Sequence, residues 1–290
     1  MKAIAYTILI ISLAGCTASN IKGIEREFST ESFQLAKLQE RIDTLDFERA
    51  NKFSAGQLDA TTDSVTRVYI KKLKDSVNAR LNNFKAIISN KKNRVNKKQA
   101  LEYLNTVKQN YNKDLSNIIF LDDLFKASTF NRLNTAAFFG PGEYKLTDSA
   151  AEQASRIMQS IIMDAHKFSS KYNDRKLKAM FIVLGYADEQ EIGTGSELYK
   201  ELTADMSTKM PDRKQLNTEL SNRRASCIKN ILKDKYRSIF PAQENYLFSS
   251  SFIATGKGEA LPDGNFKDYQ PVDERRRIVL LYWSILPDLN

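Results

Sequence analysis

Hydrophobic residues in the first half of the chain recur every three or four positions and form three successive stripes, with lysine, asparagine and aspartate opposite them. The spacing places each stripe on one face of a helix, and that face must be covered by another helix. Residues 16–134 are therefore predicted to form a helical hairpin or a three-helix bundle. The stripes are Phe28, Leu35, Leu38, Ile42 and Leu45; Val65, Tyr69, Leu73, Val77, Leu81, Phe84 and Ile88; and Leu101, Leu104, Val107, Tyr111, Leu115 and Ile118.

The pattern changes near residue 135, where short apolar runs alternate with helical segments. Thr147 and Asp148 are typical helix-capping residues at the start of the first helical segment. The order predicts an α+β domain over residues 135–290, β-α-β-α-β-β, with a mixed sheet and helices on one face. The expected strands are 136–139, 178–184, 247–254 and 277–285, and the expected helices are 146–168 and 217–232.

The N-terminus has one positive charge, a short apolar run and small residues, which is the layout of a secretory signal. The run is shorter than the roughly 20 apolar residues of a membrane span. Its end, Leu13-Ala14-Gly15-Cys16, resembles the bacterial lipobox. The resemblance implies removal of residues 1–15 and attachment of a diacylglycerol to Cys16, whose two acyl chains suffice for stable membrane anchoring. The alternative is an ordinary signal peptide with an incidental cysteine.

The net charge of +9 does not by itself indicate nucleic acid. The most basic short run, residues 90–98, has no interleaved aromatic residues, which a single-strand binder would need. It is typical of a solvated turn. An exported protein instead meets lipid headgroups, acidic envelope polymers and cell-wall carboxylates, so no nucleic-acid partner is expected.

Few residues in the sequence suggest catalytic chemistry. Cys227 has no cysteine partner once Cys16 is lipidated, and its apolar helical surroundings predict a buried thiol. The single histidine, His166, cannot supply a histidine-based zinc site. No pair of acids typical of a wall hydrolase stands out. We therefore expect no cofactor, no metal and no enzymatic activity.

Four motifs in the second half carry a family resemblance. They are Gly185-Tyr186-Ala187-Asp188 at the end of a strand; Asn217-x-x-Leu220-Ser221-x-x-Arg224-Ala225 at the start of a helix; Gly256-Lys257-Gly258-Glu259 with Pro262; and Arg276-Arg277-Ile278 before the last strand. Together, and in this order, they resemble the signature of OmpA-like C-terminal domains over about residues 136–285.

The resemblance implies a site for peptidoglycan, because family members that bind the cell wall recognise the diaminopimelate of its stem peptide. It assigns the ligand's ammonium to Asp188 and its carboxylate to Arg224, a pairing that charge-assisted hydrogen bonds favour. Asn217 suits a helix N-cap whose free N–H groups would favour the same anion. An alternative is that Asp188 pairs with Arg224 as a structural bridge. The complete expected site is Asp188, Asn217, Leu220, Ser221, Arg224, Arg276 and Arg277.

Three features depart from the family pattern. Tyr186 and Ala187 stand where members usually have histidine and threonine, and Arg275 stands where they usually have asparagine before the paired arginines. An insertion at about residues 192–213, with an expected short helix at 197–206, lengthens the connection between the first two motifs. Loop entropy grows slowly with length, so the fold should tolerate the insertion, which either leaves the ligand groove open or covers it.

These observations predict a lipid-anchored envelope protein that grips peptidoglycan and tethers membrane to wall. Thr17 is not an aspartate, which by resemblance to enterobacterial sorting favours the outer membrane, with the protein facing the periplasm. The alternative is a structural subunit of an envelope machine, a secretion system or motor, in which the helical region binds partner proteins.

Overall fold

The computed structural model describes residues 21–89, 97–127, 130–133, 139–208, 210–240, 248–262 and 270–287. The expected signal peptide, Cys16, most of the basic run and residues 136–138 lie outside this part of the chain. The chain forms two compact units: Met1–Asp43 with Lys71–Ile118, and Thr44–Ile70 with Ile119–Asn290. Across the described residues, no helix has the length and apolar character needed to cross a membrane.

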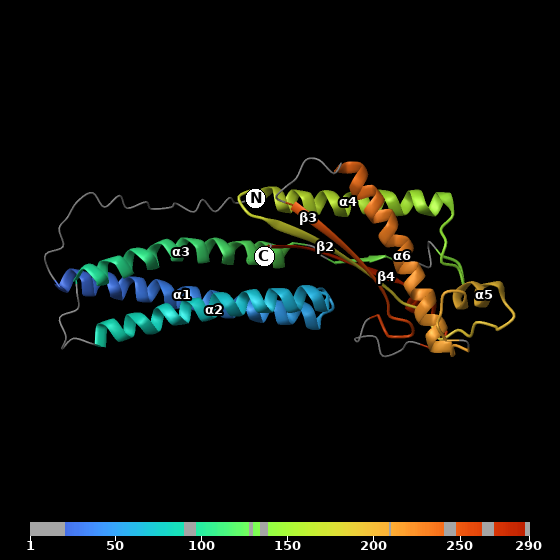
Figure 1. The fold of residues 1–290 in the computed structure, drawn as a ribbon, viewed down its shortest axis with the longest axis horizontal. Coiled ribbons are helices and arrows are strands. Elements are labelled where there is room, and N and C mark those ends of the chain that lie inside the picture. Colours follow the sequence, from blue (N-terminus) through green and yellow to red (C-terminus); the bar gives the residue numbers. More distant parts are fainter. Residues whose placement is uncertain are drawn as a thin grey trace. The chain divides into compact units, whose positions relative to one another are not determined.

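The first unit is built from the larger parts of three long helices (Figure 1): α1 (Ile21–Ser54), α2 (Ala60–Ser89) and α3 (Lys97–Lys126), whose remaining residues belong to the second unit. The Phe84 ring of α2 lies 4.9 Å from that of Phe28 in α1 and 5.3 Å from that of Tyr103 in α3, centroid to centroid. A three-helix bundle is therefore the correct alternative. Stripe residues buried as predicted are Phe28, Leu35, Leu38, Ile42, Leu45, Leu73, Val77, Phe84, Leu104, Val107 and Ile118.

The second unit contains a four-stranded mixed sheet in the order β1-β4-β2-β3. Strand β2 is parallel to β3 and antiparallel to β4, and β4 is antiparallel to β1. The predicted order β-α-β-α-β-β and the α+β class are confirmed. Its elements are β1 (Phe130–Leu133), α4 (Asp148–Ser169), β2 (Leu177–Gly185), α5 (Glu197–Thr203), α6 (Arg213–Ile239), β3 (Phe248–Gly256) and β4 (Val279–Pro287).

One strand and the boundary of the second unit differ from prediction. The described first strand lies at Phe130–Leu133, because this segment pairs with β4 over the register Phe130↔Tyr282 to Leu133↔Val279. Pairing, which a short apolar run does not reveal, places β1 before residue 135. The sheet-containing unit also includes the α1–α2 turn.

The two faces of the sheet are covered by different elements of this unit. Helices α4 and α6 contact each other and lie along one face, where the Trp283 ring of β4 lies 6.4 Å from that of Phe168 in α4. On the other face, Tyr282 Oη donates to Gly56 O at 3.0 Å, and Ser284 Oγ lies 3.0 Å from Thr62 Oγ1. Contacts on both faces explain why β4 is buried throughout most of its length.

Glycines allow α6 to rest directly on the ends of two strands. A Cβ on Gly185 would overlap the backbone oxygen of Ser221, and one on Gly256 would lie 2.5 Å from Asn222 N. Only glycine fits such close backbone approaches. The contact brings α6, and with it Arg224, next to the chain that leaves β2 at Asp188.

Candidate functional site

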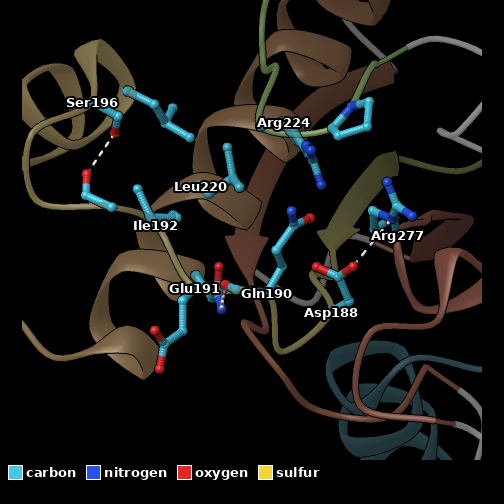
Figure 2. Close-up of a pocket in the computed structure, with 13 residues that line it drawn as sticks. Asp188, Gln190, Glu191, Ile192, Ser196, Leu220, Arg224 and Arg277 are labelled. Carbon is cyan, nitrogen blue, oxygen red and sulfur yellow. Dashed lines mark hydrogen bonds and ion pairs between the residues drawn. The ribbon is translucent and has the colours of Figure 1, made fainter.

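A cavity of about 210 Å³ lies where the segments after β2, before β4 and before α4 meet α6 (Figure 2). Of the seven predicted site residues, five line it: Asp188, Asn217, Leu220, Arg224 and Arg277. The remaining lining residues are Pro141, Gly142, Gln190, Glu191, Ile192, Gly193, Ser196 and Leu198. The structure thus brings together most of the residues that the motifs indicated.

Arg224 is a buried cation, with only 1% of its surface exposed. Its Nε donates to Glu143 O at 2.8 Å and its Nη2 to Gly140 O at 3.4 Å, and it forms an ion pair with none of the described carboxylates. Burial lowers the pKa of the Arg224 guanidinium to about 10; the charge of Asp188 opposes this lowering and that of Arg277 adds to it. A buried charge without an opposite partner is costly, and an anion in the cavity would offset that cost.

Asp188 follows β2 and is 4% exposed. Its Oδ2 lies 3.3 Å from Arg277 Nε in an ion pair, so its partner is Arg277 and the alternative of an Asp188–Arg224 bridge is wrong. This Oδ2 accepts no hydrogen bond from any described group. Figure 2 shows Asp188, Arg224 and Arg277 converging on the same space. Asp188 therefore keeps capacity to accept from a ligand there.

Asn217 lines the cavity but does not cap the helix. Helix α6 begins four residues earlier, where the Asp212 side chain accepts from Gln215 N and the Gln215 side chain accepts from Asp212 N. This reciprocal capping box satisfies the helix terminus. Asn217 Nδ2 donates instead to Gln190 O at 3.1 Å and Glu259 Oε1 at 2.9 Å. It ties the loop after β2 to the loop after β3.

Two of the predicted site residues hold loops and do not line the cavity. Ser221 is fully buried; its Oγ accepts from Gly258 N at 2.9 Å and donates to Thr218 O at 2.8 Å. Arg276 Nη1 donates to Glu189 Oε1 at 2.8 Å, and its Nη2 donates to Glu259 O at 2.6 Å. The hydrogen bond from Arg276 is the main cause that lowers the pKa of Glu189. Both residues keep the rim of the cavity in place.

The motifs did not reveal that the inserted segment, residues 192–213, contributes to the cavity. Ile192, Ser196 and Leu198 line one side of it. The expected short helix is present as α5, capped by Ser196. The sequence did offer one sign that this segment packs against the domain: it contains apolar residues at 192, 198 and 202, two of them after Gly193 and Gly195.

The residues considered for other chemistry lie apart from the cavity. Cys227 is half-buried on α6, less enclosed than predicted, and burial raises the pKa of its thiol. The His166 ring lies 4.7 Å from the Phe240 ring, centroid to centroid. Within the described ranges, no three histidine, cysteine or acidic side chains gather as a metal site.

Comparisons with known proteins add little to this picture. No family model and no curated protein matches the sequence. Among solved structures, the chain is similar to the OmpA-like domain of FopA1 from Francisella tularensis subsp. tularensis SCHU S4, with 13% identity over 55% of this chain and 72% of that chain and a TM-score of 0.27. A likeness at this level does not establish a family, so only the motifs and the chemistry of the cavity bear on function.

Proposed function

We propose that this protein binds peptidoglycan non-covalently through the diaminopimelate of its stem peptide and catalyses no reaction. One observation carries the proposal: Arg224 is buried beside the cavity with backbone carbonyls as its hydrogen-bond partners and no carboxylate paired to it. A diaminopimelate end places a carboxylate and an ammonium on one carbon. Arg224 receives the carboxylate and Asp188 the ammonium, each through charge-assisted hydrogen bonds.

The balance of charge around the cavity suits a zwitterionic ligand. Its lining contains two arginines, Arg224 and Arg277, and two acids, Asp188 and Glu191. Asp188 already forms an ion pair with Arg277, and Glu191 is exposed at the rim. The buried Arg224, on which the charges of Asp188 and Glu143 also act, is therefore the group that a ligand carboxylate would pair with directly, and the ligand's ammonium keeps the total charge unchanged.

The anchor and the compartment rest on the sequence. The lipobox-like Leu13-Ala14-Gly15-Cys16 supports a diacylglycerol on Cys16, and Thr17 supports the outer membrane, with the protein facing the periplasm. In this proposal the protein tethers membrane to wall, and the helical bundle spaces the two or binds a partner. Cys16→Ser should move the protein from the membrane to the soluble fraction after cell fractionation; retention in the membrane would contradict the anchor.

Binding is tested by co-sedimentation of the full-length protein, in mild detergent, with purified sacculi. Arg224→Ala and Asp188→Ala should each weaken binding roughly tenfold or more, since hydrogen bonds to charged groups contribute about 1.5–3 kcal/mol. Arg237→Ala and Asp234→Ala are matched controls, because both residues are exposed on α6. Circular dichroism checks the fold. If both site variants sediment with sacculi as well as the unmodified protein does, the proposed binding site is wrong.

Exposed aromatic residues favour a second candidate function, a structural subunit of an envelope machine. Phe33 and Phe47 on α1 are 61% and 67% exposed, and aromatic side chains often anchor protein interfaces. Affinity capture in mild detergent should then recover a stoichiometric partner that Phe33→Ser or Phe47→Ser releases. Capture that neither substitution changes would count against a role for α1.

A further inference from the structure

The inserted segment forms a wall of the cavity whose chemistry differs from that of the opposite wall. Ile192 and Leu198 of this segment, with Leu220 of α6, provide apolar lining; we call these three residues the apolar wall. Figure 2 shows Ile192 and Leu220 on one side and Asp188 and Arg277 on the other. A ligand in this space meets charged groups at one end and hydrocarbon at the other.

The apolar wall is held by a hydrophobic cluster of its own. Leu202 of α5 is fully buried against Leu216 and Leu220 of α6. Ile192 and Leu198 pack against this cluster, together with Tyr144, Tyr199 and Met206. The inserted segment is therefore packed onto the domain like a core element.

A polar clamp fixes the same segment from outside. Arg223 Nη2 donates to Glu201 O of α5 at 2.9 Å, and its Nη1 donates to Tyr144 Oη at 3.2 Å. Tyr144 Oη in turn donates to Glu201 Oε2 at 2.6 Å. Arg224, the next residue, donates to Glu143 O, and Glu143 lies beside Tyr144 in the loop before α4. The two adjacent arginines thus hold the apolar wall and the charged site in one fixed arrangement.

We infer that the inserted segment determines specificity: the site selects an amino acid whose zwitterionic head is followed by an aliphatic chain, which lies against Ile192 and Leu198. The inference rests on the proposed function and extends it from the head group to the chain. Each chain methylene buried against the wall should strengthen binding by up to about fourfold.

The test measures how affinity depends on chain length. Ligand-observed NMR with the full-length protein in mild detergent gives Kd values for alanine, 2-aminobutyrate, norvaline and norleucine, each in both enantiomers. For one enantiomer, affinity for the unmodified protein should rise about twofold to fourfold per methylene. In the double variant Ile192→Ser, Leu198→Ser that rise should flatten while alanine binding persists. Met210→Ser is the matched control, because Met210 belongs to the same segment but is 88% exposed. In this variant the increase in affinity per methylene should be the same as in the unmodified protein.

The outcomes separate this inference from the proposed function. If neither enantiomer of any of the four amino acids binds the unmodified protein, the proposed head-group site fails. If alanine and norleucine bind equally, or the rise survives in the double variant, the inference is overturned while the head-group site stands. Loss of alanine binding in the double variant would show that the wall only supports the fold, which also overturns the inference.

Discussion

Both units of the protein contain buried arginines, and Arg80 of the first unit differs in its partners from Arg224 of the second. In the helical bundle, Arg80 of α2 is 8% exposed and pairs with Asp114 of α3, which is 7% exposed. In the sheet unit, Arg224 is 1% exposed and donates to backbone carbonyls. A buried charge that forms an ion pair within the protein contributes to the fold. A buried charge that has no ion-pair partner and lies beside a cavity is available to a ligand of opposite charge. We call the first a matched charge and the second an unmatched charge.

The comparison predicts its largest effect in the bundle. Arg80→Ala should lower the free energy of unfolding by about 3 kcal/mol, because Asp114 would remain buried without its partner. Urea unfolding measures the change, and sacculus binding should stay unaltered. The double variant Arg80→Met, Asp114→Leu should recover most of the loss. A loss below about 1 kcal/mol in the single variant would contradict the cost expected for a buried Asp114 without its partner.

The next effect concerns the contact that positions the site. Gly185→Ala should lower the free energy of unfolding by about 2 kcal/mol, since the added Cβ would overlap the backbone of Ser221 and force α6 away from β2. Sacculus binding should weaken with it, because Arg224 moves with α6. Gly195→Ala is the control, as a Cβ there meets nothing within 4 Å. Equal stability of the two variants would refute the close approach.

Arg224→Met, unlike Arg80→Ala, should leave stability almost unchanged. The free energy of unfolding of this variant should stay within about 1 kcal/mol of that of the unmodified protein, because the desolvation cost of the buried guanidinium disappears together with its hydrogen bonds. Urea unfolding of this variant, compared with Arg80→Ala, sharpens the contrast between matched and unmatched charges. Destabilisation as large as that of Arg80→Ala would mean that Arg224 is chiefly structural.

The smallest effect should come from Glu189, a matched charge at the rim. Its pKa is lowered, first by the hydrogen bond from Arg276, so its contribution to stability is present above its ordinary pKa and is lost as the pH falls through the lowered value. Glu189→Gln should reduce Tm by only about 1 °C at pH 7, because a partly exposed ion pair contributes less than about 1 kcal/mol, and the difference should shrink towards pH 3. A difference independent of pH would exclude this ionic contribution.

The sequence predicted the elements better than it predicted their partners. Periodicity revealed the buried stripes around Leu38 and Val77 because burial itself sets that period. The pair Arg80–Asp114 joins two consecutive helices across 34 sequence positions, and no local pattern signals which residues of the two helices meet. β1 is a four-residue strand defined by its pairing with β4, which the order of apolar residues does not encode.

The site shows the same limit. The motifs indicated that Asp188 and Arg224 lie at one site, and both line the cavity. The spacing of the motifs in the sequence could not show that Asp188 forms its ion pair with Arg277. Asn217 resembled an N-cap because the capping box at Asp212 and Gln215 lies just upstream, within a polar stretch that has no apolar period. Ser221 and Arg276 lie in the motifs yet hold loops, since motif membership does not distinguish contact with a ligand from support of the rim.

The most direct test of the unmatched charge is a thermal-shift titration of the full-length protein. A ligand that binds only the folded state stabilises it by RT ln(1 + L/Kd), where L is the free ligand concentration, so Tm rises with ligand concentration. With meso-diaminopimelate, the unmodified protein should show a rising Tm and Arg224→Met should show none. Pentane-1,5-diamine, which has the same chain and ammonium groups but no carboxylate, should leave both unchanged. An equal shift with the diamine, or an undiminished shift in Arg224→Met, would contradict the claim that Arg224 is the protein's carboxylate receptor.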